Sequence, residues 1–372
     1  MDPILQEITN FCEKEIAPFL SKARDNLVYP GEIISGMADI GLFGINIPEQ
    51  YGGSKLPISL NLEINKILSR YWLSIPALYG THLRANQYLI DLGTEKQKNK
   101  YLPRMASGEL IASHAYHEKA IRNPLNFDTN IKKEAGKFIL TGTKEWVTNA
   151  YDSDFIIVVA KRLDCGTENL PHCSAVIVKK NDIGIKLAPE HYRTGVKGVS
   201  LCRVSFNAVE VSEESFIGGK DRCALNFISQ FRAISSLNFA ARCVGLSESI
   251  TELTRPYIMI SHRDEQSKGV IAYKWAELLM LKEAVDGFFQ RSVSLNSSKK
   301  LTKSEAHRTK VFCSQTLQEI VSRARMLTGG TGYASDDHNL IRQLNDAASL
   351  ALIDTPNDIL LTWSGKEELD ER

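Results

Sequence analysis

Three closely spaced glycines near the end of the chain could form a turn whose backbone lies close to a ligand. The segment GGTGY (329–333) places Gly329 and Gly330 after a run of helical periodicity. Backbone amides of such a turn can face a diphosphate, because glycine lets the backbone approach a ligand closely. The alternative is a helix C-cap followed by a loop, which explains one glycine more easily than three. No GxGxxG motif follows a predicted strand, so we do not expect a dinucleotide on a βαβ unit.

The cysteines and the charge balance exclude several classes of function. The seven cysteines are an odd number, are scattered and never form CxxC, which argues against a zinc site and against a disulfide framework. With 45 Lys plus Arg against 44 Asp plus Glu, the net charge is +1, so we expect no nucleic acid partner. No stretch approaches the roughly 20 apolar residues that span a bilayer, and the N-terminal segment mixes acids and bases, unlike a signal peptide. We therefore expect a cytoplasmic protein with no membrane partner.

The chain divides into three regions that differ in the periodicity of their apolar residues, and the elements in these regions must position the residues of any site. To about residue 110 the apolar residues recur at helical spacing. The next region contains short β-branched runs such as FIIVVA (155–160) with no helical pattern between them, so its sheets should be antiparallel, as a barrel or a sandwich. Long helical periodicity then returns, with short connections that favour a bundle. We predict domains at 1–112, 113–220 and 221–372.

The order of these parts resembles the acyl-CoA dehydrogenase family over essentially the whole chain. Five segments follow the family's order and spacing: GLFGINIPEQYGG (41–53), GTEKQKNKYLPRMASGEL (93–110), LTGTKEWVTNA (140–150), GVKGVSLCRVSFNAVEV (195–211) and GGTGY (329–333). The resemblance implies an N-terminal α-helical domain, a middle antiparallel β-barrel domain and a C-terminal four-helix bundle. It also implies FAD as the cofactor.

The family's reaction explains which residue types the site needs. A base removes the proton α to a thioester carbonyl, while the β hydrogen leaves as a hydride to the flavin. The α proton is only weakly acidic, so the site needs a carboxylate base and hydrogen bonds to the enolate-like carbonyl oxygen. The cofactor must accept the hydride, because no side chain can.

The resemblance assigns four residues to the flavin ring. Trp146 and Thr148 match the family's Trp-x-Thr beside the isoalloxazine; the alternative is that Trp146 belongs to the barrel core and that Thr148 is an ordinary strand residue. His117 stands where the family has a threonine that hydrogen-bonds the flavin, and we place Tyr116 beside it in the cofactor site. Glu118 alone survives from the family's Thr-Glu-Pro signature.

The glycine-rich turn that follows this signature in the family is absent. Positions 120–123 read AIRN, which alters the usual thioester pocket. We assign Arg122 and Asn123 to substrate binding, since an arginine such as Arg122 could bind a phosphate of the pantetheine arm. A solvated surface arginine is the alternative.

Two cations and the glycines are assigned to the FAD diphosphate. Arg263 retains the arginine of the family's Arg-x-x-Phe-Gly segment, which reaches FAD bound mainly by a neighbouring subunit, but the Phe and Gly are gone. Lys274 stands at a position that is usually glutamine and would add positive charge. Each of these cations could instead be a helix-surface charge. Gly329 and Gly330 match the family's Gly-Gly-x-Gly-Tyr, whereas Met326 replaces its glutamine.

Asp354 is the predicted catalytic base. Many members carry a glutamate in a Tyr-Glu-Gly-Thr turn, which reads Ile353-Asp354-Thr355-Pro356 in this chain. Aspartate is shorter by one methylene, roughly 1.5 Å of reach, and a misplacement of about 1 Å can lower a rate about 10²-fold. Three hypotheses follow: a working aspartate base for a differently seated substrate, a base supplied elsewhere, or loss of dehydrogenase activity.

The helix that supplies the base in some other members offers no carboxylate in this chain. The stretch 232–241 contains Ser235 and Ser236 but neither Asp nor Glu. Ser236 stands where many members have an arginine, and we assign it to substrate binding.

The sequence therefore predicts an FAD-dependent oxidoreductase, without a metal, that dehydrogenates an acyl thioester of CoA or of a carrier protein. An electron-transfer flavoprotein is the expected electron acceptor, and a homodimer or homotetramer is the expected assembly. Two alternatives stay open. One is a non-catalytic or flavin-free subunit of a heteromeric complex, and the other is a flavin monooxygenase of the same fold.

Overall fold

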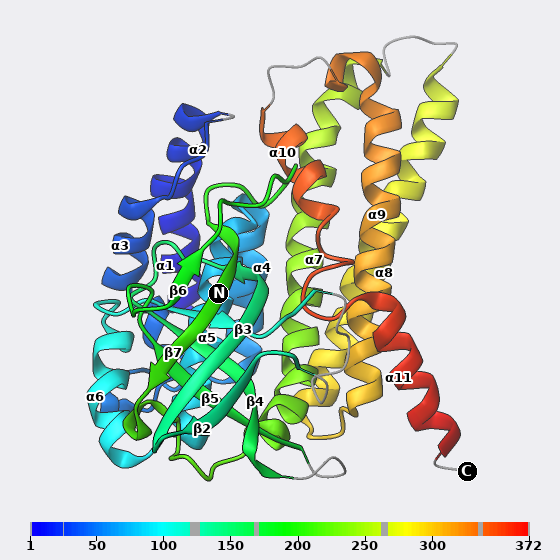
Figure 1. The fold of residues 1–372 in the computed structure, drawn as a ribbon. Helices are drawn as coiled ribbons and strands as arrows, with labels where there is room; N and C mark the ends of the chain where they lie inside the picture. Colours follow the sequence, from blue (N-terminus) through cyan, green and yellow to red (C-terminus); the bar gives the residue numbers. More distant parts are fainter. Residues whose placement is uncertain are drawn as a thin grey trace.

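The structure has helices at both ends of the chain and a β-sheet between them (Figure 1). It is a computed structural model that describes residues 2–24, 26–119, 127–166, 171–261, 267–333 and 338–370. The predicted order of helices, strands and helices is the order observed. In the part of the chain that the structure describes, no helix has both the length and the apolar character needed to cross a membrane.

The N-terminal part consists of helices joined by tight turns. Its α-helices are α1 (Pro3–Phe11), α2 (Ala17–Ala23), α3 (Gly31–Asp39), α4 (Ile58–Tyr71), α5 (Ser74–Leu92) and α6 (Glu95–Ala106), with a π-helical turn at Cys12–Ile16 and 3₁₀ turns at Leu42–Gly44 and Glu49–Tyr51. The turn-rich segment 41–53 folds back on itself: a Cβ on Gly53 would lie 2.2 Å from the carbonyl oxygen of Ile47. Glycine at position 53 therefore allows the two arms of this turn to approach each other closely.

In the described residues of the middle part, seven strands form one sheet. They are β1 (Ala112–Ala115), β2 (Asn130–Glu134), β3 (Lys137–Thr148), β4 (Phe155–Gly166), β5 (Pro171–Val178), β6 (Ile185–Leu187) and β7 (Leu201–Val211). A 3₁₀ turn at Glu213–Ser215 follows β7. Along the sheet the order is β1-β4-β2-β3-β7-β6, with β5 paired to β4.

The strand pairing differs in one respect from the antiparallel expectation. The pairs β2–β3, β3–β7, β4–β5 and β6–β7 are antiparallel, whereas β4 runs parallel to both β1 and β2. Parallel neighbours need a connection of about a dozen residues or more, and residues 116–154, which join β1 to β4, are long enough. Strand patterning marks which residues are buried but not which strand pairs with which, so the sequence could not distinguish these arrangements.

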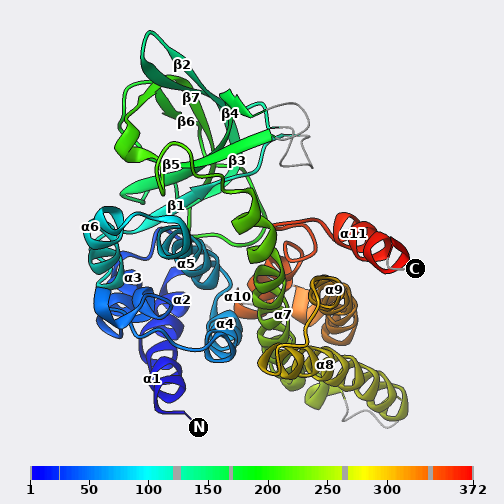
Figure 2. The same ribbon diagram turned by 90° about the horizontal axis from the view of Figure 1, so that it is seen from below.

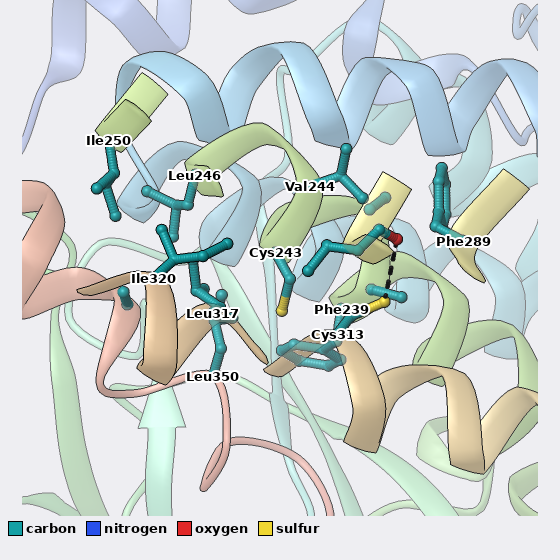
Figure 3. Close-up of a cluster of buried hydrophobic side chains, with 14 of the residues drawn as sticks. Phe239, Cys243, Val244, Leu246, Ile250, Phe289, Cys313, Leu317, Ile320 and Leu350 are labelled. Carbon is teal, nitrogen blue, oxygen red and sulfur yellow. Dashed lines mark hydrogen bonds between the residues drawn. The ribbon is translucent and has the colours of Figure 1, made fainter. Parts of the chain in front are cut away.

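The C-terminal part packs helices around a continuous apolar core. Its helices are α7 (Leu225–Ser261), α8 (Lys268–Ser297), α9 (Lys303–Tyr333), α10 (His338–Ala347) and α11 (Asn357–Asp370). Figure 3 shows part of this core, where side chains from α7, α8 and α9 meet the segment after α10 at Leu350. Cys313 is buried in this core, and its thiol lies 3.8 Å from the carbonyl oxygen of Val285. Cys313 therefore behaves as a small apolar residue of the core.

The N-terminal and C-terminal helices are joined by close packing of α4 on α7, which lie side by side in Figure 2. At the contact, a Cβ on Gly245 of α7 would lie 2.1 Å from the carbonyl oxygen of Lys66 in α4. Beside it, the Nζ of Lys66 lies 2.8 Å from the carboxylate of Glu248. The absence of a side chain at Gly245 therefore sets how closely these two helices approach.

We expect Gly245→Ala to lower the free energy of unfolding by about 1–3 kcal/mol, because the methyl group must push the α4 backbone away. Gly287→Ala in α8 is the matched control, since nothing lies within 4 Å of a Cβ at that position. That control should raise the free energy of unfolding by about 0.5–1 kcal/mol, because alanine is the better helix former. Urea denaturation of both variants measures the difference, and equal effects would contradict the packing argument.

Candidate active site

A pocket of about 360 Å³, part of it open to solvent, lies where the three parts of the chain meet. Helix α5, the end of β1, the start of α7 and the loop between α10 and α11 all contribute to its wall. The lining residues are Arg84, Tyr88, His114, Tyr116, His117, Phe227, Ile228, Phe231, Arg232, Ser235, Asp354 and Thr355. A pocket of this size, with apolar walls and a few polar groups, is typical of small-molecule sites.

Asp354 binds two partners inside this pocket. Its Oδ1 lies 3.1 Å from Nη1 of Arg84, and its Oδ2 accepts a hydrogen bond of 3.1 Å from the hydroxyl of Ser235. Arg84 also donates to the Ser235 hydroxyl at 2.7 Å, which closes the network. Burial by itself would raise the pKa of Asp354, but Arg84, followed by His117 and Lys310, lowers that pKa well below its usual range. Asp354 is therefore a carboxylate at neutral pH.

Lys310 fixes the loop that carries Asp354 through hydrogen bonds to its backbone. Asp354 has a left-handed backbone conformation with φ 65°, which aspartate tolerates better than most residues. The buried ammonium of Lys310, 1% exposed, donates to the carbonyl of Ile353 at 2.9 Å and to that of Thr355. These two bonds fix the backbone on both sides of Asp354 and so direct its side chain into the pocket.

The cation beside Asp354 comes from an unexpected helix. Ser236, predicted to bind substrate where many members have an arginine, is 2% exposed and is not among the residues that line the pocket. Successive residues of a helix are about 100° apart, so its neighbour Ser235 faces the pocket instead. Arg84 of α5 supplies the guanidinium. The sequence did contain a signal for it, since Arg84 is the only Lys, Arg, Asp or Glu in the helical run ALYGTHLRANQYL.

Tyr116 and His117 form the wall opposite this network, where the flavin was predicted. The Tyr116 hydroxyl accepts a hydrogen bond of 2.9 Å from Arg232, and the rings of Tyr116 and His117 meet edge to face at 5.1 Å. Burial lowers the pKa of His117 to about 4, with Asp354 opposing and Arg84 assisting that shift. His117 is thus neutral at pH 7, so its ring can both donate and accept a hydrogen bond.

A fully buried ion pair fixes the backbone that follows β1, which carries Tyr116 and His117. The Nζ of Lys144 lies 2.7 Å from the carboxylate of Glu118 and donates to the Tyr116 carbonyl at 2.9 Å. Glu118 also accepts from the backbone amides of 128–129. Burial lowers the pKa of Lys144 to about 8, and Glu118 opposes that shift. Glu118, the one residue retained from its signature, thus positions the backbone of Tyr116.

Trp146 leaves an aromatic face uncovered. A register shift in β3 between Lys144 and Val147 accompanies a left-handed conformation at Trp146, with φ 58°. Its indole is 55% exposed and lies 4.3 Å from the ring of His191, centroid to centroid. Thr148 is half-buried near the end of the same strand. An exposed indole beside a strand end is a surface that suits a planar ring such as isoalloxazine.

The residues predicted to contact the diphosphate lie at the other end of the bundle. Gly329 interrupts α9 with φ 56°, and nothing lies within 4 Å of a Cβ at Gly330. Lys274 is exposed near the start of α8, and Figure 1 shows that end of α8 beside the end of α9. Gly329 follows Lys310 by 19 residues of α9, about 28 Å at a rise of about 1.5 Å per residue. The chain therefore does not bring these residues to Asp354.

Three predicted site residues lie outside the described residues: Arg122, Asn123 and Arg263. Their assignments stay predictions. Among the residues that are described, no three His, Cys, Asp or Glu side chains form a group that could bind a metal ion.

Three family models match almost the entire chain. Residues 2–109 match the N-terminal domain of acyl-CoA dehydrogenase, residues 119–209 its middle domain and residues 226–367 its C-terminal domain. The chain belongs to the acyl-CoA dehydrogenase family. The family consists of enzymes and is known to bind FAD.

Individual relatives agree with this assignment. An acyl-CoA dehydrogenase of Bacillus subtilis (strain 168) is 27% identical over 359 residues, which is 95% of this chain and 93% of that protein. The structure of an acyl-CoA dehydrogenase from Geobacillus kaustophilus matches with a TM-score of 0.89 at 22% identity, over 98% of this chain and 96% of that one. The prolyl acyl carrier protein oxidase AnaB matches with a TM-score of 0.87 at 23% identity, over 98% and 97%. These likenesses confirm the predicted fold class.

We expect Lys144→Met to lower the free energy of unfolding by about 3–5 kcal/mol, because it leaves the Glu118 carboxylate buried without a counter-charge. Lys137→Met is the control: its pair with Glu210 has a similar distance, 2.7 Å, but is exposed to solvent, so its removal should change little. Thermal and urea unfolding distinguish the two. Similar losses in both variants would mean that the buried pair has no special role.

Proposed function

We propose that this protein is an FAD-dependent dehydrogenase of an acyl thioester, with Asp354 as the base that removes the α proton. The observation that carries the proposal is the placement of Asp354. Among the described residues that line the pocket it is the only acid, and its carboxylate is charged and held by Arg84 and Ser235. A carboxylate with a fixed orientation inside a partly enclosed pocket is what abstraction of a weakly acidic proton requires.

The other pocket residues have supporting roles in this proposal. Arg84 and Ser235 orient the carboxylate of Asp354, and Lys310 fixes the loop behind it. Apolar side chains of α7, among them Phe227 and Ile228, limit the access of water to the bound acyl chain. Bound FAD supplies the hydride acceptor that the protein's own side chains lack.

The described residues fit FAD at two separated places. Trp146, Thr148, Tyr116 and His117 would hold the isoalloxazine ring, since Trp146 offers an exposed indole and His117 a neutral imidazole in the pocket wall. Gly329, Gly330 and Lys274 would hold the diphosphate, together with Arg263, which lies outside the described residues and is assigned from the sequence alone. Because Gly329 is about 28 Å along α9 from Lys310, we propose that these residues serve the cofactor of a second copy of the chain. This is the reason to expect a homodimer or homotetramer.

The carrier of the acyl group is proposed to be CoA or an acyl carrier protein. The similarity to an acyl-CoA dehydrogenase supports the first, and the similarity to a prolyl acyl carrier protein oxidase supports the second. The proposed electron acceptor is an electron-transfer flavoprotein.

Anaerobic bleaching of the flavin by a panel of acyl-CoA and acyl-carrier-protein thioesters tests the dehydrogenase. We expect Asp354→Asn to retain FAD but to reduce the flavin at least about 10²-fold more slowly, because the general base is lost. Asp39→Asn, an exposed substitution of the same kind in α3, should bleach like the unchanged protein.

Three outcomes would contradict this proposal. Normal bleaching by Asp354→Asn would show that another group is the base. A colourless protein that cannot be reconstituted with FAD would instead support the non-catalytic alternative. Rapid oxygen consumption by the reduced flavin in the presence of substrate would support the monooxygenase.

The pH dependence of kcat/KM tests the role of Arg84, because that profile reports groups of the free enzyme. The base must be deprotonated, so the rate falls as the pH drops through the pKa of Asp354. Arg84 lowers that pKa, and Arg84→Gln should therefore move the acid limb upward by about 1–3 pH units. Arg84→Lys retains the charge and should leave the limb close to its original position. An unchanged limb in Arg84→Gln would contradict the assignment.

A further inference from the structure

A second arginine of the pocket forms no ion pair with any residue that the structure describes. Arg232 lies on α7 three residues before Ser235, and both line the pocket. Its one hydrogen bond among the described residues goes from Nη2 to the Tyr116 hydroxyl at 2.9 Å, and its guanidinium carbon lies 4.6 Å from the ring centre of Trp363 in α11. Within the described ranges it forms no ion pair. A neutral hydroxyl and an indole orient the guanidinium but do not neutralise it.

The remaining charges of the pocket cancel. Arg84 pairs with Asp354 at 3.1 Å. Burial lowers the pKa of His117 to about 4 and that of His114 well below its usual range, so both rings are neutral at pH 7. His307, which also faces Arg232, has its pKa lowered to about 4 by burial. Among the described residues that line the pocket, the charged groups are Arg84, Asp354 and Arg232, so the lining has one surplus positive charge. The buried ammonium of Lys310, behind Asp354, adds to the positive potential.

A surplus guanidinium in a partly apolar pocket favours an anionic ligand. Arginine has five N–H donors in a planar fork, and one hydrogen bond to Tyr116 leaves a pair of donors free for a carboxylate. Charges attract more strongly in such a pocket than in water, because the surroundings are less polarisable. The lining side chains Phe227 and Phe231 offer aromatic surface to the chain that would carry the anion. Tyr88 adds an aromatic ring whose hydroxyl lies 3.1 Å from Nε2 of His114.

We infer that Arg232 binds a carboxylate on the acyl chain of the substrate, so that the preferred thioesters carry a second, free carboxylate group. The inference rests on the proposed function and adds the class of its substrate. Arg232 is then a specificity-determining residue: Asp354 faces the proton to be removed, and Arg232 holds the anionic group of the acyl chain.

The test compares thioesters that differ only in this charge. N-acetylcysteamine thioesters of four-, five- and six-carbon dicarboxylic acids are matched with the same thioesters in which the free carboxylate is a neutral amide. Because N-acetylcysteamine has no phosphate, any effect of charge comes from the acyl chain. Binding to the FAD-loaded protein is measured by calorimetry, and flavin bleaching is measured separately.

We expect the carboxylate to bind about 10- to 100-fold more tightly than the amide at one chain length, as for a charged hydrogen bond. Arg232→Gln should abolish this ratio while the affinity for the amide changes little, and Arg232→Lys should retain part of it. Arg255→Gln, an exposed substitution on the same helix, should leave the ratio intact. An arginine that only supports Tyr116 and Trp363 would weaken both ligands equally in Arg232→Gln.

Several results would overturn the inference. No preference for the carboxylate, a preference that survives Arg232→Gln, or no binding of either thioester would each do so. Weaker binding of free CoA by Arg232→Gln, without an effect of the acyl carboxylate, would identify a phosphate site instead. The experiment distinguishes failure of the inference about Arg232 from failure of the proposed dehydrogenase function. Arg232-dependent binding without bleaching would refute the dehydrogenase and leave the inference standing, whereas bleaching by neutral thioesters alone would do the reverse.

Discussion

The contact of Arg84, Ser235 and Asp354 is the constraint on which the rest of the site depends. A carboxylate removed from bulk water is costly unless a charge and hydrogen bonds replace its hydration. Its partners come from α5 and α7, and Lys310 of α9 holds the backbone on both sides of Asp354. The carboxylate therefore ties the N-terminal helices to the C-terminal bundle. The pocket lies where α5 and α7 both contact the Asp354 carboxylate.

Close packing of the helices and of the sheet holds these pocket residues in fixed positions. Gly245 allows the backbones of α4 and α7 to approach closely, and a shared apolar core holds α7, α8 and α9 together. On the sheet side, the Lys144–Glu118 pair fixes the segment that presents Tyr116 and His117. Neither the α4–α7 contact at Gly245 nor the Lys144–Glu118 pair lines the pocket. Each nevertheless fixes the position of a segment that does. Groups supported in this way lose little freedom when a ligand binds, which favours precise orientation.

Periodicity and motif order were enough to predict the helical and β parts and to place Asp354 on the loop before the last helix. The geometry around Asp354 was harder to predict. Arg84 is 270 residues away in sequence, and no local pattern encodes a pairing over that distance. Ser236 was chosen over Ser235 because position in a motif was known while the rotation of α7 was not. The parallel pairing of β4 escaped prediction for a similar reason, since alternation fixes which face is buried and not which strand lies beside it.

The position of Arg84 on α5 bears on how an aspartate would act as the proposed base in this chain. Asp354 reaches roughly 1.5 Å less far than a glutamate, and its left-handed backbone and the two bonds from Lys310 set the direction of that shorter reach. The guanidinium beside this carboxylate comes from Arg84 of α5, whereas position 236 of α7 has a buried serine. Of the three hypotheses for Asp354, these contacts favour a working base with a differently seated substrate, because a charged and oriented carboxylate in a pocket wall is an arrangement that recurs at functional sites.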